Sequence, residues 1–305
     1  MINSITSPVT SSNFRDLSFK ITKDIVRAIR EGAADFNMPW NSSAELGLPR
    51  NVHSRKAYRG VNILSLWGRG ILREYRTPWW GTYQQWIELG CYVRAGERST
   101  PIVFWDTYSG KDLEEERIED RPKGRPYAKL FHVFNADQVE GFKTIRDEFI
   151  RDSFTEPEAS DHFSFFSQIP SDVRFSGTVA GYSGITDSIR MPDKWRFPSE
   201  KALCSVLAHE HIHWTGHESR LKRNLTGRFG SESYAMEELV AELGAAFTCA
   251  RLGMGLDPRK DHAPYLATWL FRLENDPGAL FSAASLAQRA SDFLFEQVAE
   301  LSEFK

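Results

Sequence analysis

The stretch AHEHIHWTGH, residues 208–217, contains the pattern HExxH in His209, Glu210 and His213. Residues four apart lie one above the other on a helix, so both imidazoles can direct a ring nitrogen at one ion. Glu210 points to an adjacent sector, from which its carboxylate can reach a water on that ion, while His211 is expected to be structural or exposed. Two neutral imidazoles, a nearby base and an open coordination position are the requirements of metal-assisted hydrolysis. The pattern therefore predicts a catalytic divalent metal site, and its alternative is a His-rich surface turn.

A third ligand is expected from EELVAE, residues 237–242, on the next predicted helix. We predict that Glu238 binds the ion and that Glu242, one turn later, accepts a hydrogen bond from a ligand imidazole. This helix is largely apolar, so its glutamates would be costly to bury without a cation. Glu237 is the alternative ligand, unless it faces solvent or a basic neighbour. His217 also competes for the ion, because it continues the four-residue stripe of histidines.

The expected ion is zinc, although a site of two histidines and a glutamate also accepts Mn²⁺ or another divalent ion. Glu210 would act as general base, deprotonating the metal-bound water and passing the proton to a leaving amine. Tyr234 and the pair His262 and Tyr265 are candidates for an electrophilic helper, with a core or capping role as the alternative. The predicted strand at residues 187–191 could border the cleft and accept a peptide by strand addition.

Outward from this motif, length and apolar patterning predict an α+β protein of two domains, residues 1–150 and 151–305. The metal motif is placed on a helix that begins after Ser199, whose hydroxyl can cap the first turn. Further helices are expected at residues 233–252, 264–273 and 283–300. The first domain is expected to hold a helix at 14–31, followed by short strands and glycine turns over 51–134. Within that second segment we expect a helix at 82–89 and a strand at 128–134. A charged loop at 109–126 and a polar connection at 147–172 complete this plan.

Residues 50–105 combine positive charge with aromatic rings. They contain nine Lys and Arg against three Asp and Glu, together with ten aromatic residues. Single strands expose base faces on which rings stack at about 1–3 kcal/mol per base, while Lys and Arg follow the phosphates. The pattern favours single-stranded DNA as a partner, and its alternative is that the rings build a core, as expected for Trp67 and Trp86. The contact candidates, which are expected in or beside glycine-punctuated turns, are Arg55, Lys56, Tyr58, Arg59, Trp79 and Trp80.

The composition is that of a globular protein, with 41% hydrophobic and 26% charged residues. No apolar run approaches the roughly 20 residues that cross a bilayer, and the polar start lacks the apolar core of a signal peptide. A cytoplasmic protein with no membrane partner is therefore expected. The three cysteines, Cys91, Cys204 and Cys249, are widely spaced. They are expected to be small buried residues rather than a disulfide framework or a thiolate zinc cluster.

Seven motifs resemble, in order along the chain, the plasmid-borne antirestriction proteins called ArdC, a family that includes DNA primase-associated conjugation proteins. The motifs are RKAYRGVNILSLW at 55–67, TYQQWIELG at 82–90, VRAGERST at 93–100, VFNADQVEG at 133–141, YSGITDSIRMP at 182–192, LAHEHIHWTGHESRL at 207–221 and YAMEELVAELGAAF at 234–247. This ordered set spans most of the chain and is far more specific than HExxH alone.

The resemblance implies a domain that binds single-stranded DNA, followed by a zincin-like metallopeptidase domain similar to the SprT-type proteases that act on DNA-bound proteins. It implies that His209 and His213 bind the metal, that Glu210 is the base and that Glu238 completes the site. The implied role is to protect conjugating DNA from restriction, with an unidentified protein substrate. The alternatives are a DNA coat with a structural or vestigial metal site, and a protease acting on DNA-bound proteins. The acidic loop between about 105 and 128 departs from a typical DNA domain and leaves the position of the groove open.

Overall fold

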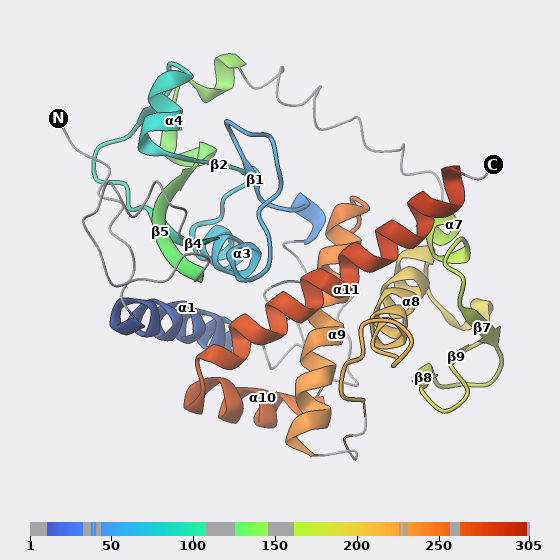
Figure 1. Ribbon diagram of the computed structural model, residues 1–305. Helices are drawn as coiled ribbons and strands as arrows, with labels where there is room; N and C mark the ends of the chain where they lie inside the picture. Colours follow the sequence, from blue (N-terminus) through green and yellow to red (C-terminus); the bar gives the residue numbers. More distant parts are fainter. Residues whose placement is uncertain are drawn as a thin grey trace.

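The computed structural model describes residues 11–32, 38, 40, 44–107, 126–145, 162–225, 227, 231–256 and 263–303. It is an α+β protein in which a sheet-containing N-terminal half adjoins a mainly helical C-terminal half (Figure 1). The N-terminal half contains α1 (Ser11–Gly32), η2 (Ala44–Leu46), β1 (Arg50–Asn51), α3 (Val61–Arg73), β2 (Trp79–Thr82), α4 (Tyr83–Glu88), β3 (Tyr92–Val93), β4 (Thr100–Thr107), β5 (Pro126–Asn135), η3 (Ala136–Gln138) and β6 (Val139–Glu140). The C-terminal half contains α7 (His162–Ser167), β7 (Asp172–Phe175), β8 (Gly181–Ser183), β9 (Ser188–Met191), η4 (Lys194–Arg196), α8 (Glu200–Thr215), α9 (Glu232–Arg251), α10 (Ala263–Asn275) and α11 (Gly278–Glu303).

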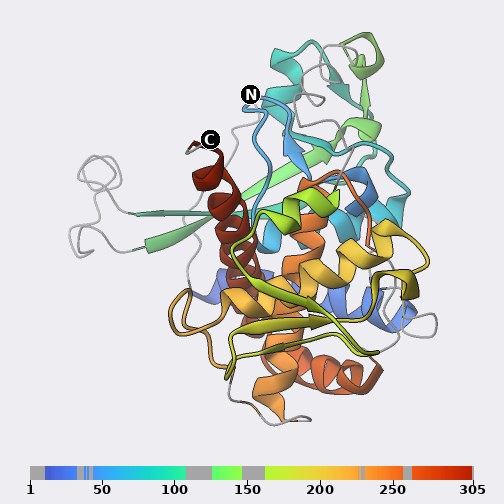
Figure 2. The same ribbon diagram turned by 90° about the vertical axis from the view of Figure 1, so that its right-hand side faces the viewer.

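Four strands form the N-terminal sheet in the order β1-β2-β5-β4. β1 is parallel to β2, and the other neighbours are antiparallel. The β4 and β5 ribbons extend to one side of the molecule in Figure 2. α3 packs on this sheet, where Leu66 belongs to one buried cluster with Trp80, Ile102 and Val133.

The helix α3 differs from the prediction of short strands and turns in this region. Ile63, Leu64 and Trp67 recur at helical spacing and are all buried, so the segment forms one amphipathic helix. Gly68 lies inside it because the neighbouring α1 comes close: a Cβ at Gly68 would lie 3.3 Å from the Cδ1 atom of Ile25. The glycines that suggest turns in the sequence are therefore compatible with close helix packing.

The positions expected for Trp79 and Trp80 are also wrong. Both lie in β2 rather than in turns, and they are only 5% and 2% exposed. Successive side chains of a strand point to opposite faces, so Trp79 joins a cluster with Trp86 while Trp80 faces α3. Neither ring offers a face to a nucleic-acid base.

A second sheet, in the order β7-β9-β8, lies in the C-terminal half beside α8. β7 is parallel to β9 and β8 is antiparallel to it, so β9 is the central strand and β7 and β8 are the two outer strands. α9 contacts α8, α10 and α11. The predicted helices of both halves are confirmed as α1, α4, α8, α9, α10 and α11, and the predicted strands as β5 and β9. Ser199 caps α8 as predicted, since its hydroxyl accepts a hydrogen bond from the Ala202 N–H at 3.0 Å.

One cluster of buried side chains extends through both halves. It includes Ile25 and Ile29 of α1 and reaches α9, where the ring centroids of Trp67 and Phe247 are 5.9 Å apart. The three cysteines are buried, as predicted. The boundary at residue 150 lies outside the described residues, as do His262 and the loop at 109–126 except for its last residue, so the division into two domains stays a prediction. Among the described helices, none is long and apolar enough to cross a membrane.

Candidate metal centre

Two helices bring three potential metal ligands together. On α8, His209 and His213 are one turn apart, and their Nε2 atoms are separated by 3.1 Å. Glu238 of α9 completes the group, with 3.4 Å between its Oε2 and Nε2 of His209 and 3.6 Å between its Oε1 and Nε2 of His213. One ligand atom from each of these three residues lies within 4.8 Å of the other two. The residues predicted from the spacing thus converge in space, and Glu238 rather than Glu237 faces the imidazole Nε2 atoms.

The close approach of the two helices depends on a glycine of α9. A Cβ at Gly244 would lie 2.8 to 3.0 Å from three side-chain atoms of Ile212 in α8. Ile212 is fully buried, so it has little room to move away. Gly244 therefore permits the short interhelical distance that brings Glu238 to the histidines.

The donor set fits a divalent cation. Nδ1 of His209 lies 2.9 Å from Oε1 of Glu242, and Nδ1 of His213 lies 3.2 Å from Oε1 of Glu237. An ionised carboxylate only accepts hydrogen bonds, so we assign the proton of each neutral ring to Nδ1, which leaves both Nε2 lone pairs facing the same point. Ligand atoms around a tetrahedral zinc ion lie roughly 3.3 Å apart, from bond lengths of about 2.0–2.1 Å. The separations in this site are close to that value.

Glu238 is held in the form that can bind a cation. In the metal-free site, where the imidazoles can be protonated, burial raises the pKa of its carboxyl, but a hydrogen bond from His209, the charges of protonated His213 and His209, and the Tyr234 hydrogen bond together lower that pKa to about 2. The side chain is 9% exposed. A buried carboxylate of this kind needs positive charge next to it, which a metal ion or protonated imidazoles supply.

These residues open into a cleft of about 1080 Å³. His209, His213 and Glu238 lie along its wall, and Glu210 lies beside them with only 4% of its surface exposed. Residues 179–185, which include β8, form another part of the lining. The prediction that the strand at 187–191 borders the cleft is wrong, because β9 is the central strand and β8 is the edge strand at the cleft.

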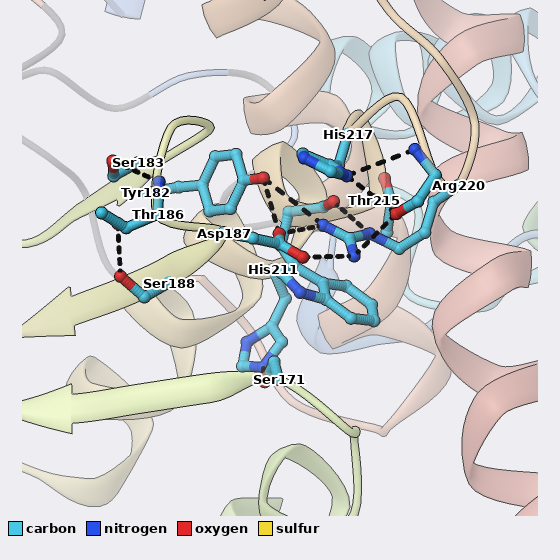
Figure 3. Close-up of polar contacts among 12 residues, drawn as sticks. Ser171, Tyr182, Ser183, Thr186, Asp187, Ser188, His211, Thr215, His217 and Arg220 are labelled. Atoms are coloured by element: carbon cyan, nitrogen blue, oxygen red, sulfur yellow. Dashed lines mark hydrogen bonds and ion pairs between the residues drawn. The ribbon is translucent and has the colours of Figure 1, made fainter.

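A polar network connects the β8–β9 turn to the loop that follows α8 (Figure 3). The Tyr182 hydroxyl donates to Asp187 at 2.8 Å, and Arg220 donates to the other Asp187 oxygen at 2.9 Å. The Arg220 guanidinium also lies 3.9 Å from the ring centroid of Trp214. Hydrogen bonding to Arg220 holds the pKa of Asp187 below its usual range. Sequence reasoning missed this network, because its members have no characteristic spacing.

The other histidines of the motif are not part of the ligand group. His211 is fully buried, and burial lowers its pKa to about 4, so the neutral ring donates to Leu207 O and accepts from the Ser171 hydroxyl. His217 lines the cleft but makes a 2.7 Å hydrogen bond with Ser219 beyond the end of α8, which is capped at Gly216. Tyr234 lines the cleft near Glu238, whereas the side chain of Tyr265 lies outside the described residues.

Glu237 has the basic neighbour that the sequence left open. Arg223 forms two hydrogen bonds with its carboxylate, at 2.8 and 3.1 Å. Burial raises the pKa of Glu237, but hydrogen bonds from His213 and Arg223 outweigh burial and lower it. Arg223 was not among the predicted site residues, since it comes from a loop after α8.

The predicted DNA-contact residues differ in accessibility. Lys56 and Arg59 are exposed, although Arg59 pairs with Asp292 of α11. Arg55 is partly buried, with its guanidinium 5.7 Å from the ring centroid of Trp79.

Tyr58 is also partly buried, and its hydroxyl accepts a 3.0 Å hydrogen bond from Asn51 Nδ2. Burial raises the pKa of Tyr58 to about 12. In the described part of this half, the exposed rings are instead Phe19, Tyr83, Tyr92 and Phe104, at 54%, 49%, 60% and 54% exposure.

Family models match both halves of the chain. A model described as the N-terminal domain of anti-restriction factor ArdC matches residues 15–134. A model described as a zincin-like metallopeptidase matches residues 160–286, which include every residue of the ligand group.

Similar proteins and structures extend over nearly the whole chain. An uncharacterized protein y4eC of Sinorhizobium fredii is 39% identical, and the match covers 96% of each chain. DNA primase TraC of Escherichia coli is 33% identical over 91% of this chain, which corresponds to only 27% of that primase. The crystal structure of the antirestriction ArdC protein from the R388 plasmid is 33% identical, with a TM-score of 0.75 in its metal-free form and 0.74 in its Mn(II)-bound form. Each of these structural matches covers 93% of this chain and 98% of the other.

Proposed function

The chain belongs to the ArdC antirestriction family, and we propose that it protects incoming plasmid DNA by binding the single strand and cleaving a protein at its metal centre. The convergence of the two imidazoles and the Glu238 carboxylate beside Glu210 in one cleft carries the enzymatic part of this proposal. A purely structural ion gains nothing from a neighbouring base, whereas hydrolysis requires one. We place this activity in the cytoplasm, where conjugating DNA meets restriction enzymes.

His209, His213 and Glu238 would hold the ion, which we propose to be Zn²⁺ or Mn²⁺. When bound, such an ion polarises a substrate carbonyl and lowers the pKa of water. Glu210 takes a proton from a water in the cleft and delivers it to the leaving amine. Glu242 and Glu237 keep the two imidazoles oriented by accepting their Nδ1–H groups.

We propose that the protein substrate binds as an extended chain along β8. β8 is an outer strand of its sheet and, among the described strands, pairs only with β9, so its other edge can pair with a substrate strand, and its residues line the cleft. Val179 and Ile185 flank it at 65% and 99% exposure, so apolar substrate side chains are expected next to them. The Tyr182–Asp187–Arg220 network would fix this edge relative to α8.

The decisive experiment for hydrolysis is Glu210→Gln. The amide has nearly the same shape but cannot accept the proton, so proteolysis should fall to background while metal binding and DNA binding stay at wild-type levels. Antirestriction should fall with proteolysis. If antirestriction survives in full, the protein acts as a DNA coat and the metal centre has another role.

For DNA, we propose a surface built on the turn that carries Arg55 and Lys56 and on α4. Asn51, the last residue of β1 before this turn, donates a 3.0 Å hydrogen bond to Gln85 of α4, and the exposed ring of Tyr83 begins the same helix. The cations would contact phosphates and the ring would stack on a base. Affinity for single strands should fall steeply between about 50 and 200 mM salt. A flat salt response would count against this surface.

A further inference from the structure

We propose that Arg223 is a positioning residue of the metal centre, which holds Glu237 as the acceptor for the Nδ1–H group of His213. By doing so it keeps the Nε2 atom of His213 directed at the ligand group. This inference rests on the proposed metal site. It adds to that site a residue that lies outside both HExxH and the glutamates of α9.

The contacts form a continuous chain from the loop to the ligand. Arg223 donates from Nε to Oε2 of Glu237 at 3.1 Å and from Nη2 to Oε1 at 2.8 Å. The same Oε1 atom lies 3.2 Å from Nδ1 of His213. The Arg223 and Glu237 side chains are only 4% and 11% exposed, so water competes little for these bonds. A planar guanidinium that binds both oxygens fixes the rotation of the carboxylate, and the carboxylate then fixes the imidazole ring.

Arg223 also binds the end of the helix that carries the histidines. It donates from Nη1 to the Thr215 hydroxyl at 2.8 Å and from Nη2 to Ile212 O at 2.6 Å. These four hydrogen bonds engage four of the five N–H groups of the guanidinium. Its donors are thus directed at α8 and α9 rather than at a substrate, which assigns it a positioning role.

Gly216 leaves room for this arrangement. A Cβ at that position would lie 2.9 Å from Nη2 of Arg223. The backbone N–H of Arg223 in turn donates to Gly216 O at 2.9 Å, so the loop folds back on the end of α8. A lysine at position 223 would keep the charge but has no planar fork, so it could not reproduce both contacts with Glu237.

The same loop contains a matched control. Arg220 is also largely buried, at 11% exposure, and forms an ion pair with Asp187 while stacking on Trp214. Within the described part of the chain, its hydrogen bonds go to Trp214, Asp187, Ser219 and Tyr182 and not to Glu237 or His213. Replacing Arg220 therefore disturbs the same loop to a comparable extent. It leaves in place the hydrogen bonds of Arg223 with Glu237, which is the acceptor for His213.

The test measures the affinity of the full-length protein for Zn²⁺ and Mn²⁺ by competition with a chelator. The variants are Arg223→Gln, Glu237→Gln, their combination and Arg220→Gln. Loss of a partner that orients a metal ligand typically weakens binding about 10- to 100-fold, and we expect this loss for both single changes at 223 and 237. Because Arg223 acts through Glu237, its replacement in the Glu237→Gln background should weaken binding by less than about twofold. Arg220→Gln should retain wild-type affinity.

Arg223→Lys provides the conservative variant and should bind with an affinity between those of wild type and Arg223→Gln. If Arg223→Gln does not fold, Arg223→Lys takes its place in the same cycle. Additive losses, or an equal loss in Arg220→Gln, would overturn the role of Arg223. If the wild-type protein binds neither ion, the proposed metal site itself is refuted. If the wild-type protein binds an ion and Arg223→Gln binds it equally well, only the role of Arg223 is refuted.

Discussion

The metal centre and the N-terminal sheet place their polar and aromatic residues in opposite ways. At the metal centre the charged groups are buried and contact one another, as His209 does with Glu242 at 2.9 Å. In the N-terminal half the tryptophans whose side chains the structure describes are buried, while cations such as Lys56 lie at the surface. A buried group has few alternative partners, whereas an exposed one exchanges its contacts with water. Single changes should therefore have large effects at the metal centre and in the N-terminal core, and small effects on the proposed DNA surface.

The largest expected effect is on folding and comes from Trp80→Ala. The ring is 2% exposed and packs against Leu66, Ile102 and Val133. Its loss should lower the free energy of unfolding by about 3–5 kcal/mol, measured by chemical denaturation. Tyr83→Ala, which removes a ring that is 49% exposed, should change that free energy by less than about 0.5 kcal/mol. If Trp80→Ala instead weakened DNA binding without loss of stability, the division between core rings and surface rings would fail.

The next effect concerns the ligand group itself. Glu238→Gln replaces a carboxylate 3.4 Å from Nε2 of His209 by a neutral amide. Structural zinc sites bind with about 10–16 kcal/mol for four ligands, so the loss of one ligand should weaken metal binding by roughly a hundredfold or more. Glu237→Gln should cost less, because that carboxylate contacts Nδ1 rather than Nε2. Metal titration of both variants shows which change weakens metal binding more. A larger loss in Glu237→Gln than in Glu238→Gln would make Glu237 the ligand.

The contrast between the metal centre and the N-terminal sheet also explains how much of each could be predicted from the sequence. The spacing of His209 and His213 fixes their geometry because both lie on one helix, and the apolar neighbours of Glu238 and Glu242 indicate where a buried carboxylate needs a cation. Such information is local. Arg223 reaches the site from a loop, and no periodicity gives the path of a loop.

In the N-terminal half the local signals were ambiguous for a different reason. Gly68 and Gly70 resemble turn residues, but α3 is continuous through them because its apolar face is buried against α1 and the sheet. The rings of Trp79 and Trp80 are compatible with both stacking on bases and core packing, and only the pairing of β2 with β5 places them inside. The composition does not distinguish stacking on bases from core packing, and tertiary contacts decide which of the two occurs.

Changes at two glycines, Gly244 of α9 and Gly70 of α3, are expected to have effects of intermediate size and test the same comparison between the two regions. Gly244→Ala would place a methyl group 2.8 Å from Ile212, so α8 and α9 should move apart at a cost of about 1–3 kcal/mol, with weaker metal binding. Gly70→Ala in α3 meets nothing within 4 Å and should be neutral or stabilising by about 0.5–1 kcal/mol. Denaturation and metal titration of both variants check this. Unchanged metal affinity in Gly244→Ala would show that the helix spacing does not control the site.

The smallest effect is expected at the surface, from Lys56→Ala. Lys56 is exposed, so its removal should leave the free energy of unfolding within about 0.5 kcal/mol of wild type. If it contacts one phosphate, affinity for single strands should fall similarly for all base sequences, and the slope of log affinity against log salt should decrease by about 0.7. Fluorescence anisotropy at several salt concentrations measures both quantities. Lys201→Ala on α8 is the control, because it removes the same charge far along the chain from the proposed surface. An equal change of slope in that control would mean that net charge, rather than the turn carrying Arg55 and Lys56, determines binding, and the DNA surface would then have to be sought on another part of the protein.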